Sequence, residues 1–261
     1  MVLKILRETR LGGATIVILL LLTWEVFSRL SLVDPLYVPT VTSILEALWS
    51  VLRSGELPGH YAASLVRAGM GYGLATLCGI VFGTVIGYAL IAYNLTEPLV
   101  ELLRPVPSTA LIPLAILFLG IGDEMKVFIV AWASFWPILL NTIDGVRSVD
   151  RLLVDTALTF GSERREIVRK IILPAAAPQI ATGMRVSLAL ALILTVVVEM
   201  ISGNNGIGFF ILDSERAFRI KEMFAGTFSL AVVGYLLNRL FITADSYLLG
   251  WHRGLTSKEQ R

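Results

Sequence analysis

The side chains of this 261-residue chain that could do chemistry are few, and their spacing matches no common catalytic motif. No G-x-x-x-x-G-K-[ST] loop is present to hold a nucleotide phosphate, and neither H-E-x-x-H nor G-x-S-x-G occurs. His60 and His252 are far apart, and Cys78 is the only cysteine, which excludes an internal disulfide and a cysteine-based metal cage. We therefore expect no catalytic residue, no metal site and no cofactor bound by this chain.

The most informative spacing lies between residues 144 and 178, where Asp155, Thr156 and Ala157 are followed by Gly161 and then by Ile171, Leu173 and Pro174. The composition predicts two short helices around a turn at Gly161, which can adopt positive φ. The first helix carries apolar side chains and the second carries basic ones (Leu152, Leu153 and Leu158; Arg164, Arg165, Arg169 and Lys170). A loop of this length in a compact domain is usually functional. The residues alone fit two roles equally well: a hairpin lying on anionic lipid, or an element that docks a partner protein.

Four other polar residues lie in or beside apolar segments. Glu199 is ionisable, and such a residue inside a membrane is by default a hypothesis for a functional site. It lies near the outer end of its segment, however, where solvation or pairing with an outer-loop arginine explains it equally well. Ser108, Thr109 and Asn141 are weaker candidates for a translocation pathway, because polar side chains also form hydrogen bonds between helices.

The elements that position these residues are membrane helices. The chain is 56% hydrophobic and only 16% charged, against roughly 25% charged residues in soluble domains, and its mean hydropathy is +0.77. Six apolar blocks have about the length that crosses a bilayer: 11–27, 64–91, 106–121, 127–143, 179–201 and 224–249. We predict an all-α, polytopic membrane protein with an N-terminal segment 1–10 and a C-terminal tail 251–261. The first block is short enough to be a cleaved signal peptide, which would leave five spans.

The distribution of positive charge predicts the orientation. With the N-terminus inside, about two thirds of the 22 Lys and Arg residues fall in cytoplasmic segments, as the positive-inside rule requires. Six spans then place both termini in the cytoplasm and loop 144–178 on the same side.

Small residues and prolines indicate how the spans pack. Gly79, Gly83 and Gly87 form one face of the second span, with Gly71 and Ala75 continuing the row, which predicts either a tight helix crossing within one subunit or a dimer seam. Pro107, Pro113 and Pro137 predict kinks in the third and fourth spans, as occurs where freed backbone groups face protein or a pathway.

Two segments outside the spans also have helical character. One starts with the capping-box spacing of Ser43 to Glu46 and ends near Gly55, and the other follows the glycine-rich turn 203–208. We expect interfacial helices on the outer leaflet, or a docking surface for an external partner.

The spacing of loop 144–178 resembles the EAA loop of ATP-binding-cassette (ABC) importer permeases, with Asp155 in place of Glu and Thr156 in place of the first Ala. Further stretches resemble the nitrate, taurine, alkanesulfonate and bicarbonate branch of these permeases: 38–40 (VPT), 103–107 (LRPVP), 112–115 (IPLA), 120–122 (GIG), 136–142 (WPILLNT), 145–150 (GVRSVD), 182–185 (TGMR) and 199–200 (EM). The resemblance extends over roughly residues 35 to 250.

This resemblance implies a type I importer (MetI-like) permease fold in a bacterial inner membrane. It also implies three protein partners: ABC ATPase subunits that bind ATP and Mg, a second permease copy in a homodimer, and an extracytoplasmic solute-binding protein. No nucleic-acid partner is expected. The coupling residues carried over are Asp155, Thr156, Ala157, Gly161, Ile171, Leu173 and Pro174. The alternative is a self-contained channel or secondary transporter, which would not need such a loop. An organic sulfonate is the preferred substrate, with taurine and nitrate as similar anions.

Overall fold

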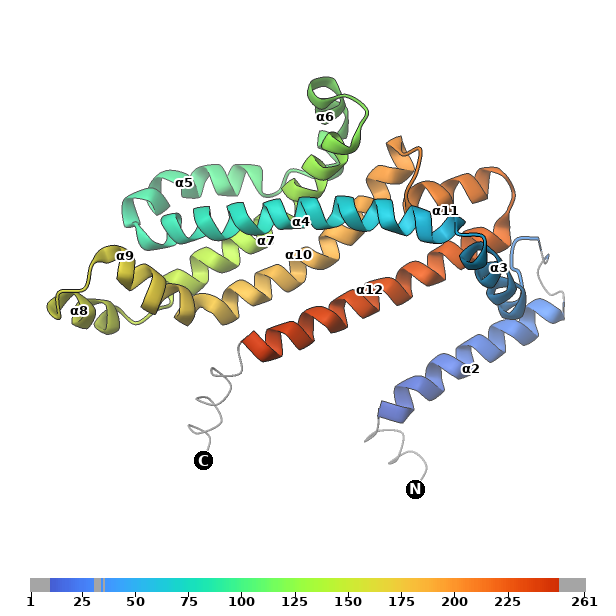
Figure 1. The fold of residues 1–261 in the computed structure, drawn as a ribbon, viewed down its shortest axis with the longest axis horizontal. Coiled ribbons are helices and arrows are strands. Elements are labelled where there is room, and N and C mark those ends of the chain that lie inside the picture. Colours follow the sequence, from blue (N-terminus) through green and yellow to red (C-terminus); the bar gives the residue numbers. More distant parts are fainter. Residues whose placement is uncertain (1–9, 31–33, 35, 249–261) are drawn as a thin grey trace.

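The computed structural model describes residues 10–30, 34 and 36–248, and in this part the chain is entirely helical (Figure 1). In chain order the elements are α2 (Arg10–Arg29), α3 (Val41–Arg53), α4 (Glu56–Tyr88), α5 (Leu90–Leu103), the 3-10 turn η1 (Ser108–Leu111), α6 (Ile112–Leu119), α7 (Asp123–Arg147), α8 (Arg151–Thr159), α9 (Arg164–Ile167), the π-helical turn η2 (Val168–Ile172), α10 (Leu173–Ser202), α11 (Ile207–Arg216) and α12 (Ile220–Leu248). Residues 1–9 of the expected N-terminal segment, the whole expected tail 251–261 and His252 lie outside the described residues.

Four helices in the described part are long and apolar enough to cross a membrane: Glu56–Tyr88, Asp123–Arg147, Arg164–Ser202 and Ile220–Tyr247. The bent pair Leu90–Leu103 and Ser108–Leu119 gives a fifth if it forms one broken span. The expected first span, 11–27, lies in α2, a helix of 20 residues. The all-α polytopic fold is therefore confirmed, whereas this count does not confirm the expected number of six spans.

Helices α4, α7 and α10 form the centre of the molecule. The row of small residues on α4 packs directly against α7 of the same chain: a Cβ atom at Gly79 would lie 2.8 Å from Ile138 Cγ2, and one at Gly83 would lie 2.6 Å from Thr142 Cβ. Only glycine permits these backbones to approach so closely. Of the two predicted roles for this row, the structure shows the tight crossing within one subunit.

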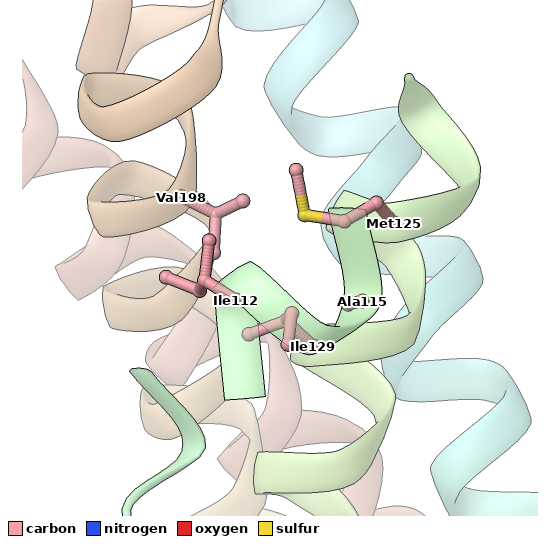
Figure 2. Packing of buried hydrophobic residues seen from close by; sticks show 5 residues of the cluster. All are labelled: Ile112, Ala115, Met125, Ile129 and Val198. Carbon is pink, nitrogen blue, oxygen red and sulfur yellow. The ribbon is translucent and has the colours of Figure 1, made fainter. Parts of the chain in front are cut away.

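Helices α5 and α6 differ from the single span expected over 106–121. The two segments meet at an angle of 85°, with the sequence Arg104-Pro105-Val106-Pro107 between them. Proline lacks a backbone donor and disfavours helical geometry in the residue before it, so the helix cannot continue through this stretch. Beyond the break, Ile112 and Ala115 of α6 pack on Met125 and Ile129 of α7 and on Val198 of α10 (Figure 2).

The two segments outside the spans pack on the ends of the long helices. The first helix begins at Val41, because Thr40 has extended backbone and its Oγ1 accepts a hydrogen bond from Ser43 N, whereas Ser43, the expected cap, is already helical. Val51 of α3 and Phe210 of α11 lie in one buried cluster with Leu57 of α4. Both segments are therefore anchored in the protein core.

Candidate coupling hairpin and polar clusters of the membrane helices

The segment between α7 and α10 forms a helical hairpin, hereafter the coupling hairpin (residues 150–172). Asp150 caps α8 by accepting a hydrogen bond from Leu152 N at 2.9 Å. The helix ends in a Schellman motif, in which Ser162 N donates to Ala157 O and Gly161 N donates to Leu158 O. Gly161 has φ of 79°, a left-handed conformation that a Cβ atom disfavours. The expected turn at Gly161 is thus present.

The second half of the hairpin is continuous with a membrane helix. Helix α9 passes through the π-helical turn η2 into α10, with Leu173 N donating to Val168 O, and Pro174 lies in the first turn of α10. The expected loop 144–178 is therefore mostly helical, since α7 extends to Arg147 and α10 begins at Leu173. The second half of the hairpin and α10 therefore form one continuous helical segment.

An apolar cluster fixes the hairpin to the ends of the membrane helices. Ala157, Ile171 and Leu173 pack partly buried against the buried residues Ile167 and Val146. Three of the expected coupling residues thus come together in one cluster, which joins the two halves of the hairpin.

The remaining expected residues lie on the outside of the hairpin. Asp155, Thr156 and Gly161 are exposed, as are the large apolar side chains Leu152 (69% exposed) and Phe160 (85% exposed). The sequence reasoning identified Leu152 but not Phe160, although Phe160 directly precedes the predicted glycine turn. An exposed apolar tip of this kind is typical of a protein contact site.

The candidate pathway residues do not converge on one site. Ser108 and Thr109 lie in η1, at the break between α5 and α6. Asn141 lies at the crossing of α7 and α10, where its Nδ2 donates to Pro137 O at 2.8 Å and its Oδ1 accepts from Gln179 Nε2 at 3.3 Å. The hydrogen bond to Gln179 joins α7 to α10, and a contribution of Asn141 to the pathway stays a prediction.

Glu199 lies in a buried polar cluster formed by α4, α7, α10 and α11. Its carboxylate is 0% exposed and accepts hydrogen bonds from Arg67 Nη1 at 2.7 Å, from Ser64 Oγ at 2.7 Å and from Gly208 N at 3.1 Å. Arg67 Nε also pairs with Asp123 at 2.7 Å. The pairing alternative for Glu199 is therefore the one that the structure shows, and the partner is Arg67 of α4.

Two arginines were not singled out as site residues from the sequence, although both fall within the expected spans 64–91 and 179–201. Arg67 is buried in the Glu199 cluster. Arg185 lies twelve residues inside α10. The missing information was the contact of each side chain with groups on other helices, which hydropathy does not give.

Comparison with known proteins agrees with this architecture. The family described as "Binding-protein-dependent transport system inner membrane component" matches residues 75–248. The chain is 33% identical to the putative aliphatic sulfonates transport permease protein SsuC of Bacillus subtilis, over 87% of this chain and 83% of the relative. It is 30% identical to the taurine transport system permease protein TauC of Escherichia coli, over 94% of this chain and 91% of that protein.

A solved structure of the MetNI methionine ABC transporter in an inward-facing conformation has the same fold. Its matching chain gives a TM-score of 0.60 at 16% identity, covering 80% of this chain and 97% of the other. At this identity the match shows the fold alone. Together with the family match over most of the chain, it shows that this protein belongs to the inner membrane components of binding-protein-dependent transport systems, the permease subunits of ABC importers.

Proposed function

We propose that this permease subunit forms, with a second copy of itself, the translocation pathway for an organic sulfonate. The substrate class is supported by the names of two relatives, which are described as permeases for aliphatic sulfonates and for taurine and which match over most of their length. Nitrate is the alternative substrate. It is a smaller anion of similar charge, but it has no apolar group that could contact apolar side chains along the pathway.

The observation that carries the mechanism is the coupling hairpin. Asp155, Thr156 and Gly161 are exposed beside the apolar tip, while Ala157, Ile171 and Leu173 fix the hairpin to the membrane helices. A partner ATPase that binds the tip in two arrangements would bias two states of the permease, which is the requirement for alternating access. The ATPase supplies ATP and Mg, and a solute-binding protein delivers the substrate on the opposite side of the membrane.

The proposed orientation places both termini and the coupling hairpin in the cytoplasm. The hairpin lies between the ends of α7 and α10. Binding of the ATPase to it would put this end of the long helices in the cytoplasm. Helices α3 and α11 lie at the other ends of the long helices (Figure 1), where a binding protein would dock.

Substitution of Gly161 tests the coupling role. We expect Gly161→Val to reduce substrate-stimulated ATP hydrolysis at least tenfold, because a β-branched residue at φ of 79° costs about 1–2 kcal/mol or more and distorts the Schellman turn. The measurement is ATP hydrolysis by the transporter reconstituted with its ATPase and binding protein.

Gly161→Asn is the matched control, since asparagine tolerates the left-handed conformation. It should retain most of the activity. Full stimulation in Gly161→Val would contradict the coupling role, and failure of an ATPase to co-purify with the wild-type chain would favour a self-contained channel or carrier.

A further inference from the structure

A cavity of about 460 Å³ lies between α10 and α12, outside the coupling hairpin and the Glu199 cluster. The two helices run side by side in opposite directions (Figure 1). Most of the lining is aliphatic, including Leu192 and Val196 of α10 and Leu230 of α12. Cavities of 300–1,000 Å³ with apolar walls and a few polar groups are typical of small-molecule sites.

Small residues leave the cavity open. A Cβ atom built at Gly234 of α12 meets nothing within 4 Å, and Ala189 lines the opposite wall. The space therefore has no side chain of its own to fill it. Glycine lowers helix propensity in the interior of a helix such as α12, so helix formation does not explain its presence at position 234. The missing side chain leaves room for a ligand.

The polar groups of the cavity are concentrated at one end. Arg185 is near the start of the α10 lining and Asn238 is at the end of the α12 lining, so the antiparallel arrangement brings them together. Arg185 Nε donates a long hydrogen bond of 3.4 Å to Asn238 Oδ1. This end lies in the half of α10 nearer to the coupling hairpin.

Arg185 has no carboxylate within ion-pairing distance in the described part of the chain, in contrast to Arg67, which pairs with both Glu199 and Asp123. Arg185 lies twelve residues into α10, about 18 Å along the helix axis. A charge at such a position in a membrane helix is costly unless it is paired or faces a polar path. Arg185 is exposed and lines the cavity, so its guanidinium is accessible to an anion that enters there.

We infer that this cavity is a transit site for an organic anion, whose sulfonate group binds Arg185 and Asn238 and whose apolar chain lies against Leu192 and Val196. The inference rests on the proposed function and adds the position and the chemistry of the site. Charge-assisted hydrogen bonds from a guanidinium suit a sulfonate, and the aliphatic walls favour a ligand with several methylene groups.

The first test measures binding to the permease co-purified with its ATPase, in nanodiscs and without the binding protein, by isothermal titration calorimetry. We expect hexanesulfonate to bind more tightly than butanesulfonate, by about fourfold per methylene group, and nitrate to bind far more weakly. Arg185→Gln should weaken hexanesulfonate binding at least tenfold and leave the weak binding of hexanol unchanged.

Arg239→Gln is the matched control for loss of charge. Arg239 is also an exposed arginine of the membrane helices, but its Nε donates to Tyr235 OH at 3.0 Å and it does not line the cavity. This variant should bind hexanesulfonate like the wild type. Equal binding in Arg185→Gln and wild type, or nitrate binding as tight as that of hexanesulfonate, would overturn the inference.

A second variant tests the apolar part of the site. Gly234→Leu should fill the cavity and weaken hexanesulfonate binding at least tenfold, with a smaller effect on methanesulfonate. Gly73→Leu, at an exposed position of α4 with equally open surroundings, is its control. If Gly234→Leu binds hexanesulfonate like the wild type, the apolar chain does not lie in this cavity.

Other occupants give distinct results in the same preparations. An anionic phospholipid that is retained by wild type and lost in Arg185→Gln, with no sulfonate binding, would assign the cavity to lipid. A cross-link between two copies through Ile193→Cys in a Cys78→Ser background, with no sulfonate binding, would assign it to the subunit interface. If sulfonate does not bind but every variant retains its ATPase with normal hydrolysis, only the proposed anion site is wrong. If the ATPase does not co-purify with the wild type, the proposed function itself is refuted.

Discussion

At the scale of single residues, the Arg67–Glu199 pair shows how a charge can be kept inside the protein. Glu199 is completely buried and Arg67 nearly so, and each makes further hydrogen bonds, to Ser64 and Gly208 and to Asp123 and Asn205. Glycine is required next to Glu199, because a Cβ atom at Gly206 would collide with its carboxylate and one at Gly208 would collide with Val196 O and with Glu199 Cβ. The cluster joins α4, α7, α10 and the turn before α11, so its role is to hold these helix ends together.

Glu199→Gln should destabilise the protein strongly. The substitution keeps the size of the side chain but leaves the buried Arg67 without its buried counter-charge, and breaking a buried pair in this way costs about 3–5 kcal/mol. The expected result is a melting temperature several degrees lower for the purified permease in detergent.

Glu166→Gln provides the comparison, because Glu166 also pairs at 2.7 Å, with Lys170, but both side chains are exposed. An exposed pair contributes little, so its melting temperature should remain near that of the wild type. If Glu199→Gln instead kept normal stability and lost transport, Glu199 would act in the translocation pathway.

At the scale of elements, the crossing of α4 and α7 depends on the absence of side chains along one face of α4. We expect Gly83→Leu to disrupt this crossing, since its Cβ atom alone would lie 2.6 Å from Thr142 Cβ. Overpacking of this kind typically costs about 1–3 kcal/mol. The measurement is the yield and melting temperature of the monodisperse permease.

Gly73→Leu on the same helix meets open space and should be tolerated, because leucine has a higher helix propensity than glycine. Equal tolerance of both substitutions would mean that the α4–α7 contact is not as close as the structure places it.

The elements also show which parts of the fold could be predicted from sequence. Hydropathy located the apolar segments and the glycine row located a close crossing, because both patterns are local. The break between α5 and α6 was anticipated only as kinks, since Pro107 marks a weak point but not an angle of 85°. Helix ends were misplaced where polar residues continue a helix past the apolar block, as at Glu56 and at Arg147.

The coupling hairpin could also be predicted only in part from the sequence. The spacing of Ala157, Gly161 and Ile171 identified the hairpin, but it did not separate residues that fix the hairpin from those at its surface. That distinction depends on how the two halves of the hairpin fold onto Val146 and Ile167, which the spacing of the residues alone does not give. Likewise the pairing of Arg67 with Glu199 joins residues on different helices and leaves no local pattern.

At the scale of the whole molecule, the coupling hairpin presents an exposed apolar surface. Leu152, Leu153 and Phe160 are exposed in and directly after α8, while the second half of the hairpin, α9, continues into α10. The sequence left two environments open for this surface, an ATPase groove and anionic lipid. They differ in which side chains carry the binding, because a groove buries the apolar tip whereas lipid attracts the basic residues of α9.

Leu152→Asp should therefore separate the permease from its ATPase. Burying an unpaired carboxylate in a protein contact costs several kcal/mol, so we expect the amount of ATPase that co-purifies to fall at least tenfold. Leu152→Met should retain it, because the side chain stays apolar. Neutralising Arg164 and Arg165 together with glutamine should change ATPase retention little if the tip carries the contact. The opposite pattern, with ATPase bound normally to Leu152→Asp and fewer anionic lipids retained by the permease after loss of the two arginines, would place the hairpin on lipid.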